Sequence, residues 1–228
     1  MRLVRGLFGA QLNIIWDILT FLGLEMDRII SPDYSNLTAS ALRGLSYLEI
    51  WQRCVRDAMY DFHLDDGAFF QFYIESFNPL EARYSYYECP YRCESYHSYV
   101  RKHLGCEPKD AGDLFMQEYS DYVLACPQKE SVTPIRYDYK PAHYVEGRHP
   151  ASHVHFGHLN NVRVATKRVL APPLSFFLLI VRQHYPDSWG KLLTRREAGH
   201  WCRYVRDHLE SVDEEYRKPH DELEMILD

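Results

Sequence analysis

The sequence predicts an α+β fold in which an antiparallel β-sheet is surrounded by helices. Several stretches repeat apolar residues at helical spacing, whereas others alternate apolar and polar residues as half-buried strands do. An Asp-Gly pair at residues 66–67 stands between two alternating runs, which is typical of a β-hairpin. With 228 residues, 46% of them hydrophobic and 25% charged, the chain is long enough to bury a core of its own.

The predicted helices lie on both sides of the strands in the sequence. They span residues 5–22, 41–60, 96–104, 113–124, 172–185 and 195–216. The helix that opens at Pro172-Pro173 is apolar almost all round, so we expect it to lie buried at the centre. The C-terminal helix is expected to be long and exposed. Its predicted inner face comprises Trp201, Val205, Leu209 and Val212. Together with the N-terminal helices, these two helices pack around the sheet in the predicted fold.

The predicted strands are short and alternate in polarity. They span residues 60–64, 70–74, 82–88, 133–139, 152–156 and 162–165. The first three follow one another closely, with the Asp-Gly turn after the first and Pro90 ending the third, and so predict an antiparallel meander. Without an internal repeat or a long linker, the sequence favours one domain over residues 1–218, followed by a loose acidic tail at 219–228.

Composition favours a cytoplasmic protein with no membrane partner. Six cysteines are scattered along the chain, which is typical of reduced thiols and not of a disulfide scaffold. The apolar run over residues 3–24 is interrupted by Gln11, Asn13 and Asp17, so we expect neither a signal peptide nor a membrane span. The net charge of -6 argues against bulk binding of nucleic acid, because non-specific affinity comes from neutralising phosphates.

Each of the last three predicted strands has one apolar and one polar face. Alternate side chains of a strand share a face, so Arg136 and Asp138 lie opposite their apolar neighbours in the first of them. The same alternation separates His153 and His155 in the second strand, and Arg163 in the third, from apolar residues. If the three strands are neighbours with their apolar faces on the core, the five polar side chains converge.

Histidines are dense around this predicted polar face. Five of the 12 histidines lie between residues 143 and 158, where about 0.8 would be expected by chance. Histidine titrates near neutral pH and is also a common metal ligand, so the density is compatible with acid–base chemistry and with metal binding.

Three interpretations of the polar face remain open. In the first, His153 and His155 are acid and base around a phosphodiester, Asp138 orients one imidazole, and Arg136 and Arg163 clamp the phosphate. In the second, the two histidines and Asp138 bind a divalent metal that keeps an open position for water. In the third, the face is structural and is held together by ion pairs and hydrogen bonds, as polar sheet faces commonly are.

Five segments of the chain resemble a bacterial family catalogued only as a domain of unknown function. They are residues 60–72, 83–87, 136–139, 149–157 and 176–186, and the resemblance is expected to cover most of the chain. Its most specific part is the block His149-Pro-Ala-Ser-His-Val-His-Phe-Gly157.

The Arg136-Tyr-Asp138 segment and the histidines that follow it are also similar to small toxins of bacterial toxin–antitoxin pairs. This resemblance implies a role in defence or growth arrest, with action on nucleic acid or a nucleotide. It transfers only Arg136, Asp138, His153 and His155. The present chain is longer than those toxins and has two extra N-terminal helices.

We therefore expect a prokaryotic toxin or defence-type effector that cleaves a phosphodiester without a cofactor. The expected catalytic residues are His153, His155 and Asp138, and the expected substrate-binding residues are Arg136, Arg163 and His149. The alternative cofactor is a divalent metal on the three catalytic residues. The alternative function is a non-enzymatic subunit of a defence or mobile-element complex, which docks a protein partner through the C-terminal helix and acidic tail.

Overall fold

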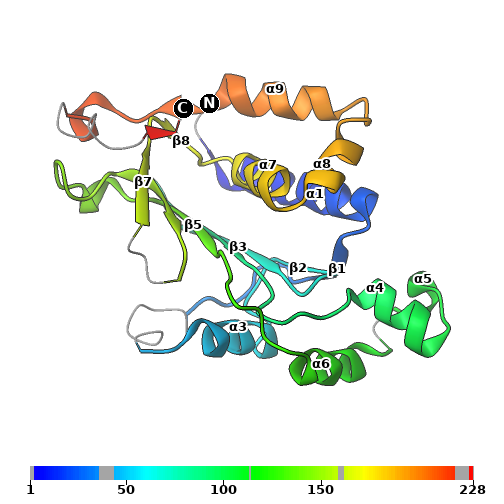
Figure 1. Cartoon of the computed structure of the whole chain (residues 1–228). Helices are drawn as coiled ribbons and strands as arrows, with labels where there is room; N and C mark the ends of the chain where they lie inside the picture. Colours follow the sequence, from blue (N-terminus) through cyan, green and yellow to red (C-terminus); the bar gives the residue numbers. More distant parts are fainter. Residues whose placement is uncertain (1–2, 36–43, 113, 159–161, 219–225, 228) are drawn as a thin grey trace. The chain divides into compact units, whose positions relative to one another are not determined.

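The computed structural model describes residues 3–35, 44–112, 114–158, 162–218 and 226–227. Helices and strands follow one another along the chain, and the fold is α+β, as predicted (Figure 1). The chain divides into two compact units. Unit 1 comprises residues 1–22, 72–86 and 134–228, and unit 2 comprises residues 23–71 and 87–133. The expectation of a single domain over residues 1–218 stays a prediction.

Unit 1 contains most of the sheet. Its strands are β3 (Phe69–Phe77, from Phe72 onward), β4 (Leu80–Tyr87, up to Tyr86), β5 (Ile135–Tyr139), β6 (Ser152–Phe156), β7 (Val162–Thr166) and β10 (Ile226–Leu227). They are neighbours in this order. Strands β4 to β7 are antiparallel, whereas β10 pairs with β7 in parallel. The strands predicted at 133–139, 152–156 and 162–165 are thus confirmed, and they lie side by side.

Helices pack together in unit 1. They are α1 (Arg5–Leu22), α7 (Pro173–His184), α8 (Pro186–Leu192) and α9 (Ala198–His208), with short 3-10 turns at Pro141–His143 and Glu214–Tyr216. Helix α7 contacts α1, α8 and α9, and it is buried over most of its length, as predicted (Figure 1). The fully buried Phe176 meets Phe72 edge-to-face at 6.3 Å between ring centroids and lies 6.0 Å from Tyr84. This aromatic cluster ties the central helix to β3 and β4.

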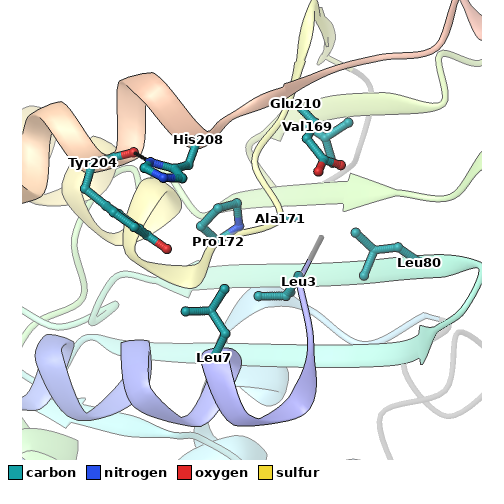
Figure 2. Close-up of a pocket in the computed structure, with 9 residues that line it drawn as sticks. All are labelled: Leu3, Leu7, Leu80, Val169, Ala171, Pro172, Tyr204, His208 and Glu210. Carbon is teal, nitrogen blue, oxygen red and sulfur yellow. Dashed lines mark hydrogen bonds between the residues drawn. The ribbon is translucent and has the colours of Figure 1, made fainter. Parts of the chain in front are cut away.

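A small cavity lies where α1, the segment before α7 and α9 meet (Figure 2). Leu3, Leu7 and Pro172 line one part of the cavity. Tyr204 and His208 line another part, and their rings stack with 4.3 Å between the centroids. Its volume of about 30 Å³ is enough for little more than one water molecule. It is therefore a packing imperfection and not a ligand site.

The C-terminal helix is shorter than predicted. It begins at Ala198 and ends at His208, after which Leu209 is extended. Glu210–Ser211 form strand β9, which pairs with β8 (Arg168–Val169) in a separate two-stranded sheet. The expectation that Leu209 and Val212 belong to a helical face is wrong, because backbone pairing with β8 replaces the helix there. The predicted tail falls outside the described residues except for Ile226–Leu227, which form β10.

Unit 2 consists of short helices, two complete strands and the first residues of β3, 69–71. Its elements are β1 (Glu25–Arg28), α3 (Tyr47–Arg56), β2 (Phe62–Leu64), α4 (Tyr96–Tyr99), a π-helical turn (Val100–Leu104), α5 (Pro108–Ala111) and α6 (Met116–Ala125). The helix predicted at 41–60 is shorter, with residues 41–43 outside the described part. A capping box fixes the start of α3. The Ser46 side chain accepts a hydrogen bond from the Glu49 backbone amide, and the Glu49 side chain accepts one from the Ser46 backbone amide. Across the described residues of both units, no helix is long and apolar enough to cross a membrane.

The predicted Asp-Gly turn is confirmed in unit 2. Strand β2 pairs antiparallel with the start of β3, and Gly67 between them has φ of +80°, where glycine carries no steric cost. A Cβ at this position would lie 3.0 Å from the sulfur of Cys89, so the turn also needs glycine for lack of space. Trp51 donates a hydrogen bond from Nε1 to the Gly67 carbonyl at 3.0 Å, which anchors α3 on the turn.

His63 of β2 should make unit 2 sensitive to acid. Its side chain is buried, and burial lowers its pKa to about 4, against partial opposition from Asp27. The unfolded chain takes up this proton near pH 6.5, so stability is complete above that pH and falls as the pH drops towards 4. The loss should amount to about 3 kcal/mol in the free energy of unfolding.

Urea denaturation at pH 7 and pH 4.5 measures this effect in the wild type and in His63→Phe. The variant should lose a clearly smaller part of its stability on acidification. The exposed His200, changed to alanine, provides the control for a histidine outside any core. Equal acid sensitivity of wild type and His63→Phe would contradict the assignment.

Candidate functional site

The sheet register brings the predicted polar face together in unit 1. Asp138 of β5 lies directly opposite His153 of β6, and Arg136 lies opposite His155. His155 in turn lies opposite Arg163 of β7. Because directly opposite residues of antiparallel strands share a face, the five side chains predicted to converge do lie on one side of the sheet.

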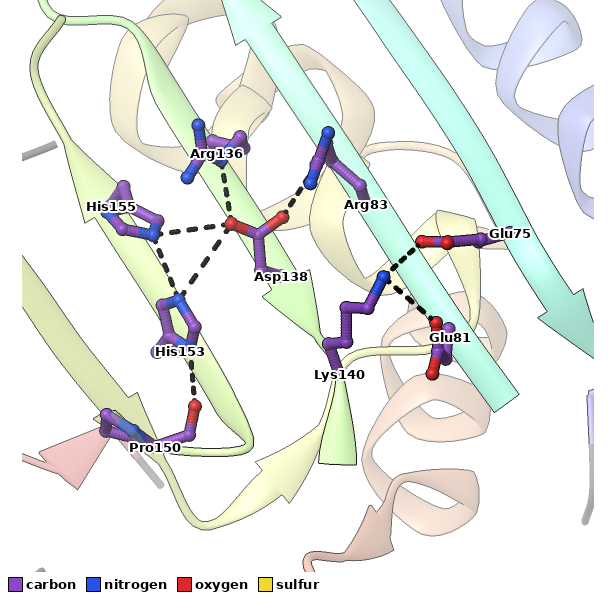
Figure 3. A network of polar contacts seen from close by, with 9 residues as sticks. All are labelled: Glu75, Glu81, Arg83, Arg136, Asp138, Lys140, Pro150, His153 and His155. Carbon is purple, nitrogen blue, oxygen red and sulfur yellow. Dashed lines mark hydrogen bonds and ion pairs between the residues drawn. The ribbon is translucent and has the colours of Figure 1, made fainter. Parts of the chain in front are cut away.

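The carboxylate of Asp138 is the centre of this group (Figure 3). Arg83 of β4 donates a hydrogen bond from Nε to Oδ1 at 2.9 Å, and Arg136 donates from Nε to Oδ2 at 2.8 Å. The same Oδ2 lies 3.3 Å from Nε2 of His155 and 3.9 Å from Nε2 of His153. One carboxylate therefore joins two guanidinium groups and two imidazoles.

The two imidazoles face each other inside the sheet face. Their Nε2 atoms are 2.9 Å apart, and the residues are only 1% and 2% exposed for His153 and His155. His153 Nδ1 lies 2.8 Å from the carbonyl oxygen of Pro150, which can only accept a hydrogen bond. His153 therefore carries its proton on Nδ1, and its Nε2 lone pair points at His155 and Asp138.

The charge states follow from burial and from these neighbours. Burial, together with the nearby His155, lowers the pKa of His153 to about 3. Burial also lowers the pKa of His155. The hydrogen bond with Asp138 raises this pKa, but it offsets the effect of burial only in part. Burial alone would raise the pKa of Asp138, but its hydrogen bond with His155 and the charges of Arg136 and Arg83 hold it well below the usual range. At neutral pH the site holds two neutral imidazoles and one carboxylate.

The face forms the floor of a pocket of about 240 Å³. His149 lies at its edge, with its ring centroid 4.9 Å from that of His153. Arg163 donates a hydrogen bond from Nη1 to the Arg148 carbonyl at 3.3 Å. Its Nε and the Nδ1 atoms of His149 and His155 are buried without a hydrogen-bond partner among the described residues. All six predicted site residues thus border one pocket, and three of them keep unused polar atoms.

Four charged residues of the pocket were not predicted from the sequence. Arg83 forms an ion pair with Asp138. Lys140 forms a separate ion-pair group, in which its Nζ lies 2.7 Å from Oε2 of Glu75 and 3.2 Å from Oε2 of Glu81 (Figure 3). A signal for Arg83 exists, because it alternates with the buried Tyr84 and Tyr86. Finding it required knowing that β4 pairs with β5, which places Arg83 directly opposite Asp138.

The arrangement is suited to three chemical tasks. Guanidinium groups can hold an anion such as a phosphate, because they present paired donors and a fixed positive charge. A neutral imidazole with a free lone pair can accept a proton. Asp138, His153 and His155 also form the one group among the described residues whose ligand atoms, all within 4.8 Å of one another, could hold a metal ion.

Comparison with known proteins identifies a family but no characterised relative. No curated protein and no solved structure matches the chain. A family model described as "Uncharacterized conserved protein (DUF2290)" matches residues 20–222, which covers most of the chain and includes the complete pocket. The expected membership in a family known only as a domain of unknown function is therefore confirmed: the chain belongs to the uncharacterized conserved protein family DUF2290.

Proposed function

We propose that this protein hydrolyses a phosphodiester bond of a nucleic acid or nucleotide in the pocket above Asp138, His153 and His155. The observation that carries the proposal is the convergence of three guanidinium groups on one pocket whose floor is a buried carboxylate–imidazole cluster. A role as a prokaryotic toxin or defence effector rests on the resemblance of the Arg136–Asp138 segment and the histidines to toxins.

Charge supports an anionic substrate. Arg83, Arg136 and Arg163 border the pocket, and only the first two share a single carboxylate, that of Asp138. Lys140 forms separate ion pairs with Glu75 and Glu81. The charged side chains that border the pocket are four cations and three carboxylates, which leaves one positive charge in excess and favours a phosphate group over a neutral substrate.

The histidine geometry supports proton acceptance. His153 donates from Nδ1 to Pro150, so its Nε2 is a hydrogen-bond acceptor, and it lies 2.9 Å from Nε2 of His155. A water molecule in the pocket can use this acceptor once the ring of His155 moves away from it. In hydrolysis this water loses a proton to the imidazole, its oxygen forms a bond to phosphorus, and the bond from phosphorus to the leaving oxygen breaks. The leaving oxygen gains the proton that the imidazole took from the water, or one from solvent. Because both imidazoles are neutral at pH 7, the base role is better supported than the acid role.

The test is cleavage of labelled RNA and DNA, single- and double-stranded, by wild type and by His153→Ala/His155→Ala. We expect wild-type cleavage and a rate at least about 100-fold lower in the double variant. Each reaction is run with EDTA and with added divalent ions. The exposed His200→Ala serves as matched control and should cleave at the wild-type rate. No wild-type cleavage on any substrate, with or without ions, would refute the proposal.

A non-enzymatic interaction subunit remains the alternative proposal. It requires the histidine face to be structural and flat or covered, whereas a pocket above the face supports the enzyme. A pull-down with the full chain tests it, and toxicity that is lost in His155→Ala supports the enzyme instead. A cytoplasmic location is also proposed, and its support is that all six cysteines are free thiols.

A further inference from the structure

Three potential ligand atoms form a compact triangle at the floor of the pocket. They are Nε2 of His153, Nε2 of His155 and Oδ2 of Asp138, separated by 2.9, 3.3 and 3.9 Å. The point equidistant from these three corners lies about 2 Å from each, which is the distance at which Zn²⁺ binds nitrogen and oxygen ligands. A tetrahedral ion with bonds of this length has ligand atoms about 3.3 Å apart, so the three side chains can surround one ion with shifts of a few tenths of an ångström.

From this triangle we infer that Asp138, His153 and His155 bind one divalent transition-metal ion of the Zn²⁺ class. The inference deepens the proposed phosphodiesterase, since it assigns a cofactor to the same site and rests on that proposal for its chemical purpose. With an ion bound, Nε2 of His153 is a ligand, so a metal-bound water replaces the water that this imidazole would otherwise deprotonate. The metal site itself stands on geometry that can be tested without a substrate.

The surroundings of the ligands resemble those of metal-binding histidines and carboxylates in general. Such a histidine usually donates its other ring nitrogen to a carbonyl or carboxylate, and His153 does so to Pro150 at 2.8 Å. The ligand carboxylate is usually held by hydrogen bonds, as Arg83 and Arg136 hold Asp138. Strands β5 and β6 supply all three ligands from paired positions, so the triangle is rigidly spaced.

Metal binding requires a change of tautomer in His155. Without metal, His155 Nε2 carries the proton that bridges to His153 Nε2, because the latter atom is an acceptor. An ion in the triangle replaces that proton, and Nδ1 takes up a proton, so that the imidazole stays neutral. Nδ1 of His155 is buried without a hydrogen-bond partner among the described residues.

The nearby arginines determine which cations the site accepts. Arg83 and Arg136 oppose any cation, and only one carboxylate attracts it. Ca²⁺ and Mg²⁺ bind mainly through several oxygen ligands and their charge, which this site does not provide. Zn²⁺, Co²⁺ or Ni²⁺ gain affinity from the two imidazole nitrogens. We therefore expect binding of these transition metals that excess Mg²⁺ does not displace.

Open coordination positions give the metal a role in the proposed reaction. Three protein ligands leave at least one position of a tetrahedral ion for water or a phosphate oxygen. The three ligand residues line the same pocket as the arginines. A metal-bound water ionises near neutral pH, and the metal also stabilises charge on a phosphate oxygen. Such a metal supplies the electrophilic assistance that two neutral histidines do not.

The experiment uses the full chain, stripped of metal with chelator and titrated with Zn²⁺ in a calorimeter. We expect one ion per chain and a rise in Tm of about 5 °C or more at a hundredfold excess over Kd. Co²⁺ should give visible absorption bands typical of nitrogen and oxygen ligands at low coordination number. Absence of stoichiometric binding by the wild type would overturn the inference.

Variants locate the site. His153→Gln, His155→Gln and Asp138→Asn should each lower Zn²⁺ affinity by about 100-fold or more, with circular dichroism as the check on folding. His200→Ala, which removes an exposed histidine of α9, should bind as the wild type does. Retained binding in the three ligand variants would overturn the inference, since the ion would then lie elsewhere.

Failure of the metal site and failure of the proposed function give different results. Stoichiometric Zn²⁺ binding without hydrolysis of any phosphodiester supports the metal site and overturns the proposed function. Hydrolysis that is unchanged by EDTA, by protein that binds no stoichiometric Zn²⁺, overturns the metal inference and leaves the function in place.

Discussion

Replacing Asp138 by asparagine is expected to lower the free energy of unfolding of unit 1 by about 2–3 kcal/mol and hydrolysis by at least about 100-fold. The negative charge of Asp138 compensates the positive charges of Arg83 and Arg136, and its carboxylate lies 3.3 Å from Nε2 of His155. The Asp138 side chain is only 12% exposed. An amide of the same shape leaves those cations without their counter-ion. The stability loss is kept moderate because water reaches Arg83 and Arg136, whose side chains are 48% and 29% exposed.

Urea denaturation and the cleavage assay measure the two effects of Asp138→Asn. Glu75→Gln is the matched control, because it makes the same chemical change in the half-exposed ion pair with Lys140. Its expected cost is below about 1 kcal/mol. Adding Arg83→Met to Asp138→Asn should return part of the lost stability, since one uncompensated charge is removed. A variant as stable as wild type would show that the carboxylate is not the electrostatic centre of the site.

Replacing Phe176 by alanine is expected to lower the free energy of unfolding by about 3–5 kcal/mol. The ring is fully buried in α7 and contacts the rings of Phe72 and Tyr84, so its removal leaves a cavity between the helix and the sheet. The measurement is urea denaturation followed by circular dichroism.

The control for Phe176→Ala is Leu193→Ala, an apolar truncation at a residue that is 54% exposed. It should change stability by less than about 0.5 kcal/mol. Phe176→Leu should lie between the two, because it retains most of the buried volume. A loss below about 1 kcal/mol in Phe176→Ala would mean that the neighbouring rings close the cavity.

The alternation of the sequence was sufficient to predict the polar face of the site. Period-two patterns in β5, β6 and β7 separate polar from apolar residues, and burial of one face then determines the orientation of every side chain. Tyr137 and Val154 are fully buried on the opposite side, as that argument requires. What the pattern does not contain is strand order, and so Arg83, which reaches Asp138 from β4, was missed.

Helix ends were the least predictable part of the fold. The apolar spacing of the last helix continues to Val212, yet the helix ends at His208 because residues 210–211 pair with β8. Such pairing depends on contacts distant in the sequence, and local periodicity carries no information on it. The start of α3 is different, since Ser46 and Glu49 form a recognisable capping box that was overlooked.

The arrangement of the site depends on the pairing register between β5 and β6. Asp138 faces His153 and Arg136 faces His155, so a shift of β6 by one residue turns both histidines to the surface opposite that of Asp138 and Arg136. Insertion of a single residue inside β6, ahead of His153, would then place Val154 in the pocket and both histidines in the core. Substitutions can alter this site gradually, whereas a one-residue change in strand length removes it in a single step.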